Sequence, residues 1–218
     1  MINIGRSVTR GDVRGKVTGE TRYGGDLVGP EALAAAVIRA PHPHARIRGL
    51  ELEAARAVPG VVAILGRDDV GGSNRHGLIK RDHPVFCDDR VRYLGDAVGV
   101  VVATSIEAAR AARDAVVVLH EPLPIVATMA DAVASGAPAL HDFGNVLATQ
   151  LIRKGDAERA LSEADAVVTC VFKMQGVDHA FLDIEAGYAE MVDDVITCLL
   201  YTSPSPRDRT RSRMPSSA

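Results

Sequence analysis

The chain has 218 residues, which is enough for one large domain or two small ones with a real core. Aliphatic residues dominate, tryptophan is absent, and no apolar run approaches the roughly 18–20 residues that a membrane span requires. The N-terminal arginines are not followed by an apolar stretch, which argues against a secretory signal and predicts a cytoplasmic protein.

Cysteine spacing and charge exclude several further classes. Cys87, Cys170 and Cys198 are far apart and show no CxxC spacing, so they predict neither a disulfide framework nor a zinc site. The formal net charge is −3, but the last 21 residues hold four arginines and one acid, so the rest of the chain is more acidic than this figure. We therefore expect the body of the protein to bind neither nucleic acid nor a membrane.

The first 65 residues predict short strands and one helix. Glycines around Val17, Thr21 and Tyr23 indicate a short strand within residues 15–27. Residues 30–52 could begin as an alanine-rich helix, but Pro41 and Pro43 between aliphatic positions favour two strands that meet at a corner. A short helix over residues 53–58 then ends at Pro59-Gly60, and residues 61–65 are predicted to form a buried strand.

The middle of the chain continues this alternation. A strand in the "RVRYL" segment, a turn at Gly95-Asp96 and an apolar strand over residues 98–103 are predicted. Ser105 has the position of an N-cap for the helix that follows, and "VVVLHEPLP" predicts a strand stopped by prolines. Residues 126–145 indicate a connector with one short helix, which is the best candidate for a domain boundary.

The last part of the chain predicts a helix and further strands. "AERALSEAD" has helical spacing. Val167, Thr169 and Val171 alternate with period two, and so do Tyr188, Glu190 and Val192, so both segments are predicted to be strands.

Four segments are candidates for chemistry, and each has a simpler explanation. His42 and His44 flank Pro43, and we do not favour a shared metal ion for them. We expect a structural or surface role for them, and for the isolated His76, His83 and His120. "YLGDAVG" lacks the G-x-G-x-x-G order and precedes a strand, so a tight hairpin turn is favoured over a phosphate loop.

The other two segments are rich in charged side chains. The first is a polar loop that could bind an anion or line a partner surface, although most such loops are simply solvated; it contains Arg75, His76, Lys80, Arg81, Asp82 and His83. The second could support acid–base chemistry or form a polar sheet edge; it contains Asp178, His179, Asp183 and Glu185. Neither cluster identifies a reaction.

Seven segments, in this order, carry a resemblance to a known family. They are "GKVTGETRYGGDL", "RAPHPHARI", "AARAVPGVVAIL", "VRYLGDAVGVVVATSIEAARAA", "HEPLPIV", "RKGDAERAL" and "DHAFLDIEAGYA". Together they resemble the N-terminal part of the large, molybdopterin-binding subunit of the molybdenum hydroxylases, the xanthine dehydrogenase and aldehyde oxidase family.

The resemblance implies an α+β fold with four segments. These are an α/β-hammerhead domain over residues 1–125, a connector over 126–145, the truncated start of the first molybdopterin-binding domain over 146–197, and a tail over 198–218. It also implies hydroxylation of an N-heterocycle or an aldehyde with oxygen from water. Molybdopterin would be bound by the complete subunit, and a 2Fe-2S subunit and an FAD subunit are the implied partners.

The family's glycine-rich cofactor segment and its catalytic glutamate would follow Thr197. Asp183 and Glu185 do not match the catalytic position, so we predict no catalytic, cofactor-binding or metal-binding residue in this chain. "NRHGLIKRDHPVFCDDRVRYLGDAV" most resembles the xanthine and nicotinate types, which leaves the substrate open.

The C-terminal tail, residues 198–218, is predicted to be non-native. "CLLYTSPSPRD" and "SRMPSSA" resemble translated parts of a sequencing-library adapter, so native sequence is expected to end near Thr197. Three hypotheses follow: an enzyme fragment that is inactive alone, a non-catalytic hammerhead module for binding or assembly, and an arginine-tailed nucleic-acid binder that depends wholly on the tail.

Overall fold

The computed structural model describes residue 5 and residues 7–77, 80–177 and 187–200. The chain divides into two compact units. One is Ala32–Val167, and the other combines Met1–Glu31 with Val168–Ala218. Within the described residues, no helix is long and apolar enough to cross a membrane.

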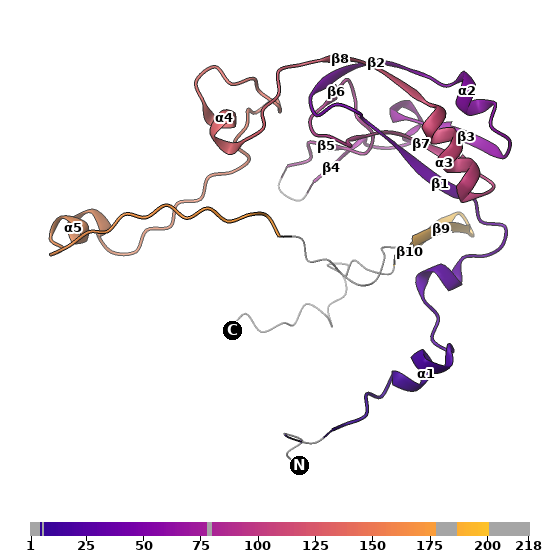
Figure 1. Ribbon diagram of the computed structural model, residues 1–218, viewed down its shortest axis with the longest axis horizontal. Helices are drawn as coiled ribbons and strands as arrows, with labels where there is room; N and C mark the ends of the chain where they lie inside the picture. Colours follow the sequence, from indigo (N-terminus) through magenta and orange to yellow (C-terminus); the bar gives the residue numbers. More distant parts are fainter. Residues whose placement is uncertain (1–4, 6, 78–79, 178–186, 201–218) are drawn as a thin grey trace. The chain divides into compact units, whose positions relative to one another are not determined.

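The larger unit contains a three-stranded antiparallel sheet with the order β1-β7-β3 (Figure 1). Its strands are β1 (Ala34–Arg39), β7 (Ala97–Ala103) and β3 (Val61–Leu65). The central strand β7 is an almost unbroken aliphatic run, as expected for a strand covered on both faces, and Val101 and Ala103 are fully buried in it. Strand β3 was predicted to be buried but is only partly so, because it lies at the sheet edge, where Val62 is 56% exposed.

A second antiparallel sheet has the order β6-β2-β8. Its strands are β6 (Arg90–Val91), β2 (Ala45–Glu51) and β8 (Val117–Pro122). The predicted proline corner is present, and it carries the chain from β1 in the first sheet to β2 in the second.

The predicted turn at Gly95-Asp96 is also present, but it does not form a hairpin. Asp96 N–H donates to the Tyr93 carbonyl at 3.2 Å, and Gly95 adopts the left-handed conformation with φ 85°. The strands on either side, β6 and β7, belong to different sheets. The turn therefore connects the two sheets.

Two helices accompany these strands. Helix α3 (Ile106–Ala115) packs against the first sheet (Figure 1) and begins as predicted at Ser105, whose Oγ accepts a hydrogen bond from Ala108 N–H at 3.1 Å. The buried positions of α3 are alanines, which allow its backbone to approach the sheet closely. The short helix α2 (Glu53–Arg56) precedes β3 and contacts α3.

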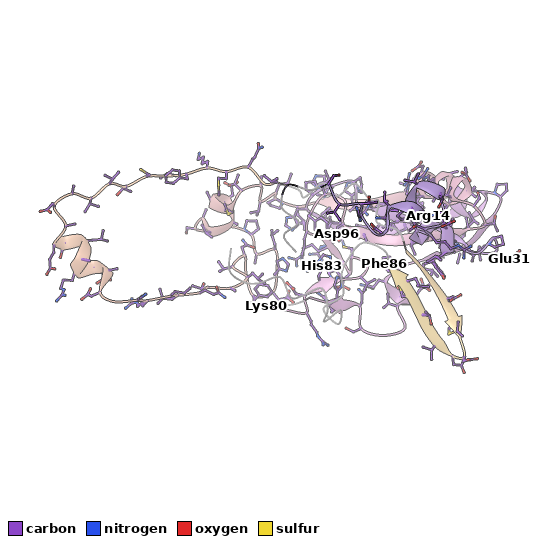
Figure 2. All side chains as sticks on the ribbon, turned by 90° about the horizontal axis from the view of Figure 1, so that it is seen from below. Arg14, Glu31, Lys80, His83, Phe86 and Asp96 are labelled. Atoms are coloured by element: carbon purple, nitrogen blue, oxygen red, sulfur yellow. The ribbon has the colours of Figure 1, made fainter. Side chains whose placement is uncertain are left out.

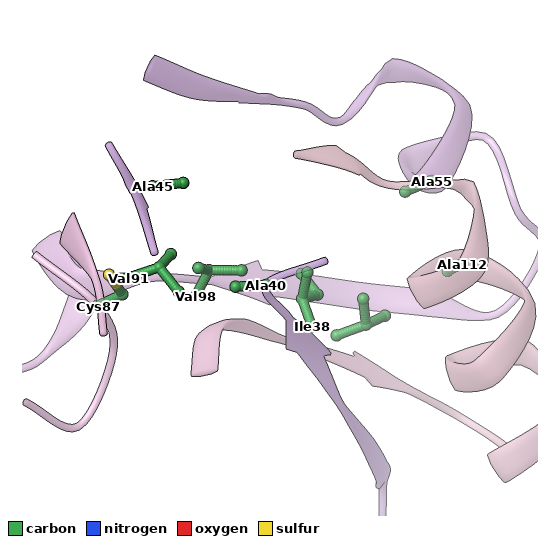
Figure 3. Packing of buried hydrophobic residues seen from close by; sticks show 9 residues of the cluster. Ile38, Ala40, Ala45, Ala55, Cys87, Val91, Val98 and Ala112 are labelled. Carbon is green, nitrogen blue, oxygen red and sulfur yellow. The ribbon is translucent and has the colours of Figure 1, made fainter. Parts of the chain in front are cut away.

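The core is aliphatic (Figure 3). Its larger members are Ile38, Val91, Val98 and Val101, and the other members are small side chains. Cys87 is buried among them with 5% of its surface exposed. The cluster comprises Ile38, Ala40, Ala45, Ala55, Cys87, Val91, Val98, Val101 and Ala112.

The rest of the larger unit is formed by short elements. These are η2 (Arg67–Asp69), the two-stranded hairpin of β4 (Arg75–His76) and β5 (His83–Pro84), and the two helices α4 (Met129–Val133) and α5 (Ala157–Ser162). Helices α4 and α5 confirm the predicted helices in the connector and in "AERALSEAD".

The second unit contains α1 (Val13–Thr18), η1 (Gly24–Leu27), β9 (Gly187–Val192) and β10 (Val195–Leu200). The predicted strand near Tyr188 is confirmed as β9, which pairs with β10 across a two-residue turn. Asp193 and Asp194 both have positive φ, as a type I′ hairpin turn requires. Cys198, Leu199 and Leu200, the first residues of the tail, lie in β10.

Two predicted strands are wrong. Residues 15–27 contain helix α1 and the 3₁₀ turn η1, because Gly19 ends α1 in the left-handed conformation and the Asp26 carboxylate accepts the Tyr23 N–H at 2.9 Å. Residues 167–171 belong to no helix or strand and pair with none of the described strands, so the alternating pattern alone did not predict a strand correctly. Val168 and Val171 are each 85% exposed.

Candidate functional site

A hollow of about 290 Å³ lies where the β4–β5 hairpin, the turn before β7 and the connector meet. We call it the hairpin–connector hollow. It lies within the larger unit, and two of its lining residues, His83 and Asp96, are labelled in Figure 2. Its lining residues are Asp82, His83, Pro84, Arg92, Tyr93, Asp96, Leu140 and His141.

Arg90 of β6 and Arg92, just after it, bind the connector backbone on one side of this hollow. Arg92 Nε donates to the Leu140 carbonyl at 2.8 Å, and Arg90 donates to the Ala139 carbonyl at 3.2 Å. The connector is held in turn by Asn145, whose side chain accepts the Leu140 N–H at 2.8 Å. These bonds fix the path of the connector where it passes the sheet.

The hairpin loop binds the connector from the other side. The Asp82 carboxylate lies 2.8 Å from Nδ1 of His141, and Lys80 Nζ lies 3.3 Å from the centre of the Phe143 ring. The second contact has the geometry of a cation–π interaction. The polar loop therefore contacts another part of the same chain, which the sequence pattern did not predict.

Asp96 and Tyr93 interact electrostatically in the wall of the hollow. Asp96 is only 2% exposed, and its carboxylate accepts the Arg92 backbone N–H at 3.3 Å. Burial, and then the nearby Asp96 carboxylate, raise the pKa of Tyr93 above its ordinary value. Tyr93 therefore stays a neutral phenol at physiological pH and is suited to hydrogen bonding but not to acting as a base.

The hollow does not have the parts of a nucleophilic active site. Its lining contains no serine, threonine or cysteine. The nearest described thiol in sequence, Cys87, is buried in the core, and desolvation raises its pKa to about 12. The arrangement can position segments and bind polar groups, but its described residues do not form a nucleophile–base pair.

The His42-Pro43-His44 segment has the structural role that we expected. His44 is 4% exposed and its Nδ1 donates to the Pro124 carbonyl at 2.5 Å, while its backbone N–H donates to Nδ1 of His42 at 3.3 Å. His120 stacks at a tilt beside His42, with ring centres 5.7 Å apart. No group of three metal-binding side chains occurs among the described residues.

The other sequence candidates are distributed as follows. "YLGDAVG" forms the turn and the start of β7, so it is no phosphate loop. Asp178, His179, Asp183 and Glu185 lie outside the described residues. Leu140, His141 and Asn145 were missed because they lie in a connector with no periodicity, and their roles arise only from contacts with distant segments.

Residues 18–124 match the family model for the aldehyde oxidase and xanthine dehydrogenase a/b hammerhead domain. The chain is 37% identical over 188 residues to a probable xanthine dehydrogenase subunit of Bacillus subtilis (strain 168), covering 86% of this chain and 25% of that protein. It is 32% identical over 203 residues to the nicotinate dehydrogenase large molybdopterin subunit of Eubacterium barkeri, covering 93% of this chain and 48% of that one.

The fold is similar to that of a solved relative, the aldehyde oxidoreductase from Desulfovibrio gigas. The TM-score is 0.79 at 32% identity, and the match covers 88% of this chain and 22% of that one. The chain thus spans between about a quarter and a half of the length of the two curated relatives described above. With its α+β architecture, the chain contains the a/b hammerhead domain of the aldehyde oxidase and xanthine dehydrogenase family.

Proposed function

We propose that the chain is the N-terminal part of the molybdopterin-binding subunit of an oxidoreductase that hydroxylates an N-heterocycle or an aldehyde with oxygen from water. The observation that carries this proposal is the hammerhead match over residues 18–124, together with 37% identity to a protein named as a probable xanthine dehydrogenase subunit. The similarity to a nicotinate dehydrogenase subunit supports a nitrogen heterocycle as the first substrate class to test.

The described residues do not themselves fit a molybdenum cofactor. No three histidine, cysteine, aspartate or glutamate side chains come together among them, and Arg92, Asp82 and His141 in the wall of the hollow already bind other parts of the chain. When bound, a molybdenum cofactor would supply the redox chemistry of the hydroxylation. We assign it no residue here, and we propose that it is held by parts of the complete subunit outside the described residues.

In this proposal the larger unit is a scaffold. The bonds from Arg90 and Arg92 to residues 139 and 140 fix the connector that leads toward the rest of the subunit. Iron–sulfur and FAD centres are proposed to lie on partner subunits, which is supported by relatives that are named as separate subunits. The chain alone would then be inactive.

The test compares the complete protein encoded at the source locus, produced with its neighbouring gene products in a host that makes molybdenum cofactor, with the 218-residue chain. Xanthine, nicotinate and an aromatic aldehyde are offered with an artificial electron acceptor. We expect the complete assembly to contain molybdenum and to oxidise at least one of them, and the 218-residue chain to oxidise none. An assembly without molybdenum and without turnover would contradict the proposal and would favour the non-catalytic binding or assembly module.

A further inference from the structure

Histidine contacts divide the described imidazoles into two groups. In four of the six described histidines, Nδ1 lies within hydrogen-bonding or ion-pair distance of a partner; these four are His42, His44, His120 and His141. The two others are His76 and His83, whose ring nitrogens have no hydrogen-bond partner among the described residues. Both of these side chains are exposed.

His76 and His83 face each other across the β4–β5 hairpin. They are direct partners in the antiparallel register, so their side chains leave the same face of the ribbon. The two ring centres are 4.6 Å apart, and the ring planes are tilted by 39°. The register of the hairpin therefore determines the approach of the two rings.

This separation is the one that a shared metal ion needs. With a metal–nitrogen distance of about 2.1 Å, two imidazoles at neighbouring coordination positions have ring centres roughly 4.5–5 Å apart. The wider His42–His120 pair, at 5.7 Å, has Nδ1 of both rings near backbone carbonyls. Among the described residues, His76 and His83 thus have the spacing and the free ring nitrogens that chelation requires. The His42–His120 pair serves as the comparison.

The surrounding charges leave the pair accessible. Asp82, next to His83, is directed to His141, and Arg75, next to His76, is paired with Asp88. Across the described part of the chain, no third histidine, cysteine, aspartate or glutamate completes a metal-binding group. Water would fill the remaining coordination positions.

We propose that His76 and His83 form a two-imidazole site for a divalent first-row transition-metal ion on the surface of the hairpin. Imidazole suits copper, nickel and zinc, and affinity rises from nickel to copper along the usual series. An ion bound there would join β4 to β5. It would also restrict the motion of the loop between them, whose Lys80 and Asp82 contact the connector. This inference does not depend on the proposed oxidoreductase function.

The test is a Ni²⁺ titration of the full chain by calorimetry. Because Cys170 and Cys198 are exposed thiols that also bind such ions, the parent protein carries Cys170→Ser and Cys198→Ser, and no histidine tag is present. The variants His76→Ala and His83→Ala remove one ligand each. His120→Ala is the matched control, since it removes an exposed ring from the wider pair.

We expect one Ni²⁺ per chain in the parent, a loss of affinity of about tenfold or more in either ligand variant, and a change of less than about twofold in His120→Ala. Saturating Ni²⁺ should also raise the melting temperature of the parent but not that of the ligand variants. His76→Asn and His83→Asn repeat the measurement if an alanine variant fails to fold. Absence of binding in the parent, or equal affinities in the parent and the ligand variants, would overturn the site.

Discussion

The Asp82 carboxylate lies 2.8 Å from Nδ1 of His141, which joins the loop between β4 and β5 to the connector. The two residues are far apart in sequence, and neither lies in a helix or a long strand. Together with the Lys80–Phe143 contact, this pair determines how the hairpin loop and the connector approach each other.

The Asp82–His141 pair should contribute little to global stability. Both side chains are partly solvated, at 27% and 33% exposure, and solvated ion pairs are usually worth about 0.2–1 kcal/mol. A double-mutant cycle with Asp82→Ala and His141→Ala, measured by urea unfolding, should give a coupling free energy below about 1 kcal/mol. A coupling above about 2 kcal/mol would show that the pair holds more of the fold than its exposure indicates.

The thiol of Cys87 should be chemically inert in the folded protein. Its pKa is raised from 9.0 to about 12, first by desolvation and then by Asp96, so it is neutral at physiological pH. Iodoacetamide at about pH 8 should modify the exposed Cys170 and Cys198 quickly, and Cys87 only after denaturant is added. Modification of all three at equal rates in native buffer would contradict this burial.

The same raised pKa predicts a loss of stability in alkali. In the folded state Cys87 keeps its proton to higher pH than in the unfolded state, so its contribution is complete below pH 9.0 and is lost as pH rises toward about 12. Cys87→Ala removes this titration. The free energy of unfolding of this variant should therefore fall less steeply over this pH range than that of the parent protein. Parallel curves of unfolding free energy against pH would show that the thiol does not contribute.

Gly99 should be intolerant of any side chain. A Cβ at this position in the central strand β7 would lie 2.8 Å from the Leu65 carbonyl oxygen of β3, which is backbone and cannot move aside without breaking the sheet. We expect Gly99→Ala to cost about 2–4 kcal/mol of unfolding free energy. Gly72→Ala is the control, because nothing lies within 4 Å of its Cβ, and it should change stability by less than about 0.5 kcal/mol.

The N-cap of α3 gives a smaller and more local prediction. Ser105→Ala removes the hydrogen bond to Ala108 N–H and should cost about 1 kcal/mol. Ser162→Ala near the end of α5 is the matched control, since its exposed hydroxyl donates to the Arg159 carbonyl and caps no free N–H. Thermal unfolding of both variants measures the difference, and equal melting temperatures would show that the cap is not needed.

Local signals predicted local structure well. The proline corner between β1 and β2 and the start of α3 at Ser105 follow from backbone restriction and from a side-chain cap, which act within a few residues. The strand predicted at residues 15–27 was wrong because glycines around a few β-favouring residues do not distinguish a strand bounded by turns from a helix that a glycine ends early.

Long-range pairing could not be predicted in the same way. Strand β7 pairs with β1 on one side and β3 on the other, so that Gly99 lies against Leu65, and no pattern within a single segment encodes these partners. The hairpin–connector hollow has the same origin, because Arg92 and Leu140 come together only in the folded chain. The charged loop and the turn were therefore recognisable in the sequence, but their connector partners Leu140 and His141 were not.

The most direct measurement of the proposed function is the origin of the oxygen in the product. The complete assembly, incubated with nicotinate or xanthine and an artificial electron acceptor in H₂¹⁸O, should yield a hydroxylated product that carries ¹⁸O, detected by mass spectrometry. A product that takes its oxygen from O₂, or an assembly that neither oxidises these substrates nor contains molybdenum, would contradict the assignment of this chain to a molybdenum hydroxylase subunit.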